Sequence, residues 1–177
     1  MKQSKSQVLK LVYAAVCLAL AMVLPLLTGQ IQSIGSKLCP MHIPVLLCGF
    51  LCGPIYGAAV GFIAPLLRFA IFGMPPIMPT GLAMAFELMT YGLLAGLLYK
   101  LFAKKTLFIY VTLILSMIGG RIIWGIAMLV ITGITGAGFT FAAFISGALL
   151  NAIPGIIIQI ILIPVIVIAL KKARLMD

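Results

Sequence analysis

The stretch Pro79–Lys100 reads PTGLAMAFELMTYGLLAGLLYK. It is mostly apolar and about as long as the α-helix that crosses the hydrocarbon core of a bilayer. At its middle lies Glu87, and the only other acidic residue of the chain is Asp177. A carboxylate at membrane depth costs about 3 kcal/mol on insertion scales, so Glu87 is expected to face a partner or a hydrated cavity. Tyr91 follows on the same helical face. The stretch is therefore predicted to form one wall of a binding site.

The composition of the 177-residue chain predicts an integral membrane protein. Hydrophobic residues make up 64% and charged residues 8% of the sequence, and the mean hydropathy is +1.34. A soluble domain needs far more charge to cover its surface. The apolar runs are continuous and lack the alternation of an outer-membrane barrel, so we expect one all-α membrane domain over residues 1–177. Six transmembrane helices are predicted, and five of them cover residues 9–28, 55–72, 79–100, 107–131 and 141–170, the last tilted or kinked at Pro154. The second is a short apolar run over residues 43–52, which forms a tilted or buried helix if residues from Cys39 onward join it.

The formal net charge of +10 is distributed as a topology signal and does not indicate nucleic-acid binding. Most of the Lys and Arg residues flank apolar runs in three clusters, which the positive-inside rule assigns to the cytoplasm. Both termini are therefore predicted to be cytoplasmic. The three clusters are Lys2, Lys5 and Lys10; Lys100, Lys104 and Lys105; and Lys171, Lys172 and Arg174.

Four polar side chains on four predicted helices are expected to converge near the outer face: Arg68, Glu87, Arg121 and Asn151. Counting at ~1.5 Å per residue from the outer helix ends assigns all four to the same half of the bilayer. Glu87 neutralises only one guanidinium, and an unpaired Arg away from water is costly unless a ligand anion or hydration satisfies it. Since a guanidinium binds both oxygens of a carboxylate, the pattern indicates a site for a small anionic molecule. The alternative is a purely structural ion pair of Glu87 with Arg68 or Arg121.

Three further residues are candidates for the same site. Trp124 and Tyr91 are predicted to supply flat apolar walls around a small molecule, and His42 lies near the outer interface. The alternatives are that the two aromatic residues are ordinary interfacial anchors and that His42 is a hydrogen-bonded boundary residue. The sequence carries no P-loop, no cluster of metal ligands and no nucleophile paired with a base, so we predict neither an enzyme nor a cofactor.

Ala15 and Ala19 lie four residues apart on the first predicted helix. Small residues at this spacing make a flat face for another helix. Packing within the bundle and docking of a partner protein are both open at this point. Gly53, Gly57 and Gly61 repeat the same spacing and predict close packing of the third helix.

Together these residues resemble the substrate-binding S components of prokaryotic energy-coupling factor (ECF) vitamin transporters. The resemblance covers nearly the full length and is carried by the six-helix pattern, the pair Ala15 and Ala19, and the block IPVLLCGFLCGP over Ile43–Pro54 with the glycines that follow it. It implies a high-affinity binding subunit of an ABC importer in the cell membrane. It further implies that the alanine pair docks on a transmembrane T component driven by two ATPase subunits, with no nucleic acid involved.

The resemblance also implies where the vitamin is bound. It is expected under the outer connections at residues 30–37, 74–79 and 132–140, and on the helix faces that carry Glu87, Arg121 and Asn151. An anionic vitamin such as pantothenate fits a net positive cavity. A neutral, riboflavin-like vitamin is the alternative if Glu87 neutralises one Arg. A stand-alone secondary transporter that uses Glu87 as a proton carrier, and a purely structural subunit, are the other classes considered.

Overall fold

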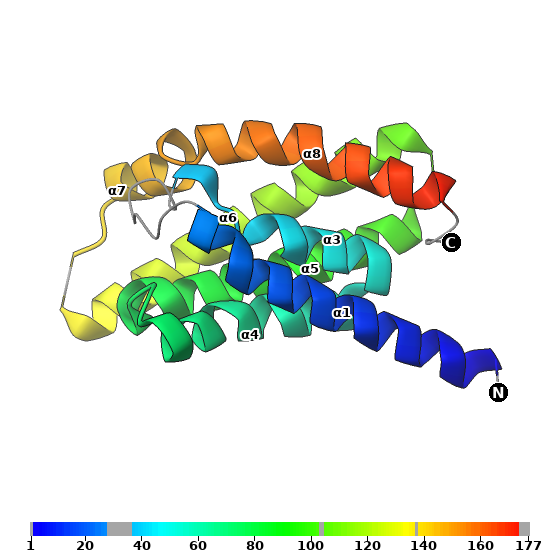
Figure 1. The fold of residues 1–177 in the computed structure, drawn as a ribbon. Helices are drawn as coiled ribbons and strands as arrows, with labels where there is room; N and C mark the ends of the chain where they lie inside the picture. Colours follow the sequence, from blue (N-terminus) through cyan, green and yellow to red (C-terminus); the bar gives the residue numbers. More distant parts are fainter. Residues whose placement is uncertain (1, 28–36, 103–104, 137, 174–177) are drawn as a thin grey trace.

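The computed structural model describes residues 2–27, 37–102, 105–136 and 138–173 of the chain. These residues form helices joined by turns, and no strand occurs among them (Figure 1). Irregular π-helical turns precede α5 (η1, Ile77–Gly81) and follow α7 (η2, Ser146–Leu150). The helices are α1 (Lys2–Leu27), α3 (His42–Cys52), α4 (Pro54–Phe72), α5 (Leu82–Leu101), α6 (Thr106–Thr135), α7 (Phe141–Ile145) and α8 (Ile153–Lys172).

Five helical segments of the described chain are long and apolar enough to cross a membrane. They are the α1 segment from Gln7 to Leu27, α4, η1 with α5, α6 and α8. Their surfaces carry many exposed Leu, Ile and Val side chains, which suits contact with lipid. The chain is therefore an all-α, multi-pass membrane protein, as its composition predicts.

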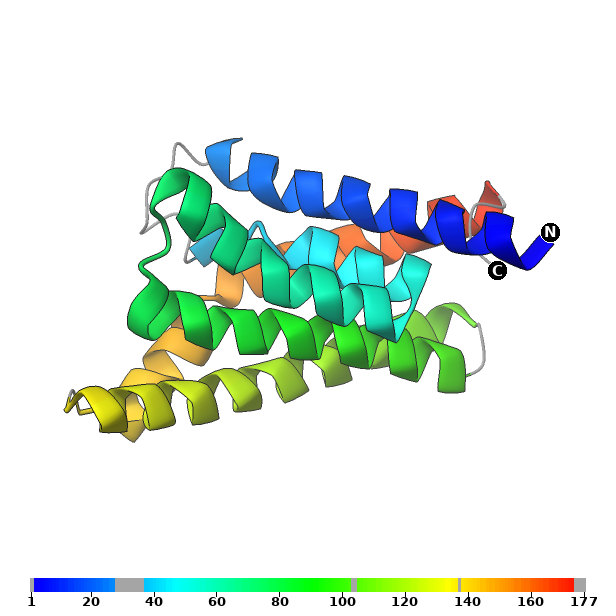
Figure 2. The same ribbon diagram turned by 90° about the horizontal axis from the view of Figure 1, so that it is seen from below.

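The short helix α3 lies at the centre of the molecule. Figure 2 shows α1, α4, α5 and α6 side by side in this order, with α3 behind that row. α3 packs against α1, α4, α5 and α8, and nearly all of its residues are buried. Because protein surrounds its ends, a helix of 11 residues lies at membrane depth without exposing backbone to lipid. It begins at His42, within one residue of the apolar run predicted from Ile43, and it is a buried helix without the residues from Cys39 to Met41.

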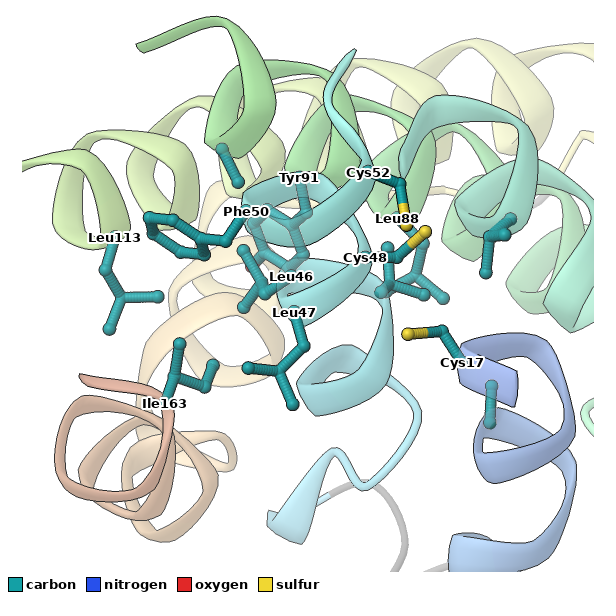
Figure 3. Close-up of a cluster of buried hydrophobic side chains, with 14 of the residues drawn as sticks. Cys17, Leu46, Leu47, Cys48, Phe50, Cys52, Leu88, Tyr91, Leu113 and Ile163 are labelled. Carbon is teal, nitrogen blue, oxygen red and sulfur yellow. The ribbon is translucent and has the colours of Figure 1, made fainter. Parts of the chain in front are cut away.

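The centre of the core is a set of apolar side chains from α3 and its neighbours. Figure 3 shows Leu46, Leu47 and Phe50 of α3 directed toward Leu113 of α6 and Ile163 of α8. On another side of α3, the sulfur atoms of Cys17, Cys48 and Cys52 point toward one another between α1 and α3 (Figure 3). These three cysteines are buried free thiols, and they pack as small apolar residues.

Glycines allow α4 and α5 to approach at backbone distance. A methyl group added to Gly57 would lie 2.6 Å from the carbonyl oxygen of Gly92, and one added to Gly61 would overlap the carbonyl of Leu88. The glycine repeat therefore does make the close helix contact that its spacing predicts. Gly53 separates α3 from α4 with a φ of 94°, a conformation that side chains disfavour.

The predicted sixth helix over 141–170, expected to be tilted or kinked at Pro154, is divided into α7, η2 and α8, with the interruption just before that proline. Pro154 explains the break. Proline has no backbone N–H and fits the first turn of a helix but not its interior, so α8 begins one residue before it, at Ile153. The expected loop at 132–140 is also shorter than predicted, since α6 continues to Thr135.

Several clustered lysines lie at one end of the molecule. Figure 1 shows the start of α1, the end of α5, the start of α6 and the end of α8 at the same end. Lys100 at the end of α5 and Lys171 and Lys172 at the end of α8 therefore share this end. Lys104, Arg174, Asp177 and the expected outer loop at 30–36 lie outside the described residues.

Candidate functional site

Glu87 lies at the centre of a buried polar cluster formed by α3, α5 and α6. Glu87 is 1% exposed. Oε1 of Glu87 lies 3.0 Å from Nη1 of Arg121 on α6 and 3.4 Å from Nε2 of His42 on α3. The carboxylate therefore faces a protein partner, as its cost in lipid predicts. Of the two arginines proposed to pair with it, the structure pairs Arg121 with Glu87.

Tyr91 forms the next layer of this cluster, one helical turn after Glu87 on α5. Its ring centroid lies 5.3 Å from that of His42, with the planes tilted by 59°, and the residue is fully buried. The ring lies against Gly120, where a side chain would overlap it. The glycine before Arg121 thus makes room for the aromatic ring beside the ion pair.

Cys39 is a member of the cluster that the sequence did not single out. It precedes α3 and has a φ of 48°, which is unusual for a residue with a side chain. Nη2 of Arg121 donates to Sγ of Cys39 at 3.7 Å, and the backbone N–H of His42 donates to the carbonyl of Cys39 at 3.0 Å. The position of Cys39 three residues before His42 is the sequence signal that could have placed Cys39 near this cluster.

The cluster retains hydrogen-bonding capacity. Nε of Arg121 and Nδ1 of His42 are buried and make no hydrogen bond within the described residues. Buried polar groups of this kind are normally satisfied by protein, water or ligand. The arrangement combines one anion, one cation and neutral donors, so it suits hydrogen-bonded recognition of a polar molecule. No group of three or more His, Cys, Asp or Glu side chains in the described chain is arranged to bind a metal ion.

Two of the polar residues predicted for the site lie apart from this cluster. Nη1 of Arg68 on α4 donates to the carbonyl of Met22 on α1 at 3.1 Å. Asn151 is exposed between η2 and α8, and its side-chain amide donates to Oγ of Ser146 at 3.5 Å. The structure therefore brings together Glu87, Arg121, His42 and Tyr91, but not Arg68 or Asn151.

Trp124 lies in a separate aromatic group at the junction of α6 and α7. Its ring is 6.2 Å from that of Phe144 in a stacked geometry and 6.0 Å from that of Phe139 in an edge contact. Trp124 contacts Gly147, and Phe144 contacts Gly125 on α6. These contacts hold α7 and η2 against α6. Trp124 lies on the same helix as Arg121, about one turn farther along the chain.

An apolar groove lies on the outer surface of α5 and α6. Its volume is ≈ 240 Å³, and the side chains that line it are all apolar: Phe86, Ile123, Ile126, Ala127, Val130 and Ile131. Such a lining offers no hydrogen-bonding side chain to a polar molecule. The polar candidate site is thus the Glu87 cluster, on the buried side of the same two helices.

A family model described as the ECF transporter, substrate-specific component, matches residues 9–167. The chain belongs to this family. The match spans all five long apolar helices almost completely, so the chain is a membrane-embedded, substrate-specific subunit of a transporter. The family is one of transporters, not of enzymes. Neither a curated protein nor a solved structure matches the chain significantly.

In this ECF substrate-specific component, Ala15 and Ala19 are exposed on α1. The opposite face of the helix carries Ala14, Cys17 and Ala21, which are buried against the bundle. Packing within this chain therefore does not use the alanine pair. The flat face remains accessible on the outside of α1, where lipid or another protein can contact it.

Proposed function

We propose that the chain is the high-affinity substrate-binding subunit of an ECF-type ABC importer for a small vitamin or vitamin precursor, in the cell membrane of a prokaryote. The observation that carries the proposal is the family match over residues 9–167. In this function the chain binds the vitamin within the bilayer, and a T component with two ATPase subunits supplies the energy for uptake. The N and C termini face the cytoplasm, as the clustered Lys residues support.

The vitamin is bound next to the Glu87 cluster. The supporting observations are the nearly complete burial of Glu87, the ion pair with Arg121, and Nε of Arg121, a donor that makes no hydrogen bond within the described chain. Ring groups of the vitamin stack near Trp124 at the outer end of α6. Asn151, between η2 and α8, contacts the bound molecule from the side of α8.

The charges of the cluster favour a neutral vitamin over an anionic one. The expectation of an anionic vitamin such as pantothenate requires a second, unpaired guanidinium beside Glu87. Arg68 instead contacts the carbonyl of Met22, and the pair of Glu87 with Arg121 has no net charge. An anionic vitamin would compete with Glu87 for Arg121 and leave a buried carboxylate without its cation, which is costly. A riboflavin-like neutral vitamin avoids this cost.

A binding panel tests the vitamin class. The purified protein is titrated with riboflavin and with pantothenate, and binding is followed by calorimetry. The expected result is tighter binding of the neutral vitamin. Tighter binding of pantothenate, abolished by Arg121→Gln, would show that Arg121 binds the ligand carboxylate and would restore the anionic class.

Reconstitution tests the transport mechanism against the alternative of a proton-coupled carrier. Liposomes that contain this protein with a T component and two ATPases are expected to accumulate radiolabelled vitamin only when ATP is supplied. Liposomes that contain the protein alone are expected to take up none under an imposed pH gradient. Gradient-driven uptake that disappears in Glu87→Gln would instead identify a stand-alone secondary transporter.

A further inference from the structure

Arg68 on α4 has a different environment from Arg121. The residue is 4% exposed, its Nη1 donates to the carbonyl of Met22 on α1 at 3.1 Å, and its guanidinium carbon lies 5.1 Å from the centre of the Phe72 ring. The only acid among the described residues, Glu87, is paired with Arg121. Arg68 is therefore satisfied by a backbone carbonyl of a neighbouring helix and by an aromatic face.

The carbonyl that Arg68 contacts lies just before a proline in α1. Pro25 is inside this helix, three residues after Met22. A proline inside a helix has no N–H to donate, so Pro25 leaves the carbonyl of Ala21, four residues earlier, without its helical partner, and its ring pushes against that turn. Met22 is the next residue in this turn. A charged donor from another helix can then stabilise the backbone where the proline weakens it.

α1 lies at the edge of the bundle. Its fully buried positions include Ala14, Cys17 and Ala21, which bury little apolar area compared with Leu or Phe, and its larger side chains Tyr13, Leu18 and Met22 are only partly buried against the core. Figure 2 shows α1 lying alongside α4 at the end of the molecule where α1 ends. The contact from Arg68 therefore adds a specific polar tie to the apolar packing of α1.

We propose that Arg68 is a positioning residue, which holds the outer half of α1 against α4 and thereby fixes the orientation of the exposed face with Ala15 and Ala19. The proposal rests on the proposed function, in which this face docks on the T component. Arg68 acts through the carbonyl of Met22 and does not contact the bound vitamin. It links the packing of α4 to the surface that a partner recognises.

Hydrogen exchange on the isolated protein tests the positioning. Arg68→Met is expected to speed amide exchange in the α1 segment 21–27 by about tenfold or more, because a hydrogen bond from a charged group is lost. Exchange in α5 around Glu87 should stay unchanged. Arg68→Lys, which keeps a charged donor, should remain close to wild type. Unchanged exchange in α1, or an equal increase in α1 and α5, would overturn the proposal.

A double replacement tests whether Arg68 stabilises the turn that the proline weakens. Pro25→Ala restores an N–H that can donate to the carbonyl of Ala21 and so stabilises the turn that includes Met22. Arg68→Met should therefore have a smaller effect on α1 exchange in this background than in wild type. Fully additive effects would contradict the proposed role of Arg68 at the proline.

Recovery of the complex from cells that co-express the T component and the ATPases tests the docking step. Arg68→Met is expected to reduce recovery several-fold, and Arg68→Lys to restore it. If Ala15→Leu with Ala19→Leu reduces recovery and Arg68→Met does not, the positioning proposal is wrong. If neither variant reduces recovery while α1 exchange still rises in Arg68→Met, the docking face proposed on α1 is wrong, and so is the docking part of this proposal. That outcome leaves the proposed vitamin binding by the isolated protein untouched.

Discussion

The two buried arginines illustrate two regions of the molecule that are built differently. Arg121 lies between α3, α5 and α6 and is paired with a carboxylate at 3.0 Å. Arg68 lies between α1 and α4 and donates to a backbone carbonyl at 3.1 Å. Both arginines are shielded from lipid, but only Arg121 forms an ion pair within the described chain. The comparison shows that the central region buries an ion pair, whereas the α1–α4 region joins a charged side chain to the backbone of a neighbouring helix.

The largest effect is expected when the central pair is broken. Arg121→Met leaves the Glu87 carboxylate buried without its cation, which costs about 3–5 kcal/mol in stability. Arg68→Met removes one charged donor to a carbonyl, which costs about 1.5–3 kcal/mol. Denaturant or thermal unfolding in detergent compares the two variants, and calorimetry with the bound vitamin should show the greater loss of affinity for Arg121→Met.

A second replacement serves as the control for that prediction. Glu87→Gln combined with Arg121→Met removes both charges, so it should recover a large part of the stability that Arg121→Met loses. Equal losses for Arg121→Met and Arg68→Met, with no recovery in the double variant, would mean that the two arginines do not differ in the way described here.

The next effect concerns the packing of α5, which carries Glu87. Gly92→Ala brings a methyl group into the backbone of Gly57 on α4, and overpacking of this kind costs about 1–3 kcal/mol. Gly133→Ala on α6 is the matched control, because no atom lies within 4 Å of the added methyl group. It should be neutral or slightly stabilising. Equal melting temperatures for the two variants would contradict the close contact of α4 and α5.

Trp124 provides a smaller and more local test. It is the only tryptophan of the chain, so its fluorescence reports on the junction of α6 and α7. Binding of the vitamin is expected to change this emission. Trp124→Phe should keep most of the affinity, whereas Trp124→Ala should lose about 0.5–1.5 kcal/mol of it, the usual contribution of an aromatic pair. An unchanged affinity in Trp124→Ala would remove this residue from the site.

The smallest effect on stability is expected on the exposed face of α1. Ala15→Leu and Ala19→Leu should change the free energy of unfolding by no more than about 0.5 kcal/mol, because both positions are exposed. They should nevertheless reduce recovery of the T component, while vitamin binding by the isolated protein is kept. Ala169→Leu, at an exposed position of α8, is the matched control and should leave the complex intact. Normal assembly of both α1 variants would assign docking to another surface.

The cysteines show why the sequence predicts which side chains are buried better than it predicts which residues they contact. Cys17, Cys48 and Cys52 are buried and pack as small apolar residues. Cys39, from the same set, instead accepts a hydrogen bond from Arg121 through Sγ. A side chain of the same type takes a different role because of what a distant helix brings beside it, and no local pattern records that neighbour.

The sequence by itself determined the membrane class, the main apolar helices, the family and the need of Glu87 for a partner. These follow from properties that each segment carries alone: its length, its hydropathy, its glycine spacing and the cost of a charge in lipid. Only the tertiary structure decided that Arg121 pairs with Glu87, that Arg68 holds Met22 of α1, and that Asn151 lies at a helix break. The reason is that depth along a helix can be counted from the sequence, whereas the direction in which a side chain points depends on the rotation of each helix, which the packing of all the others fixes.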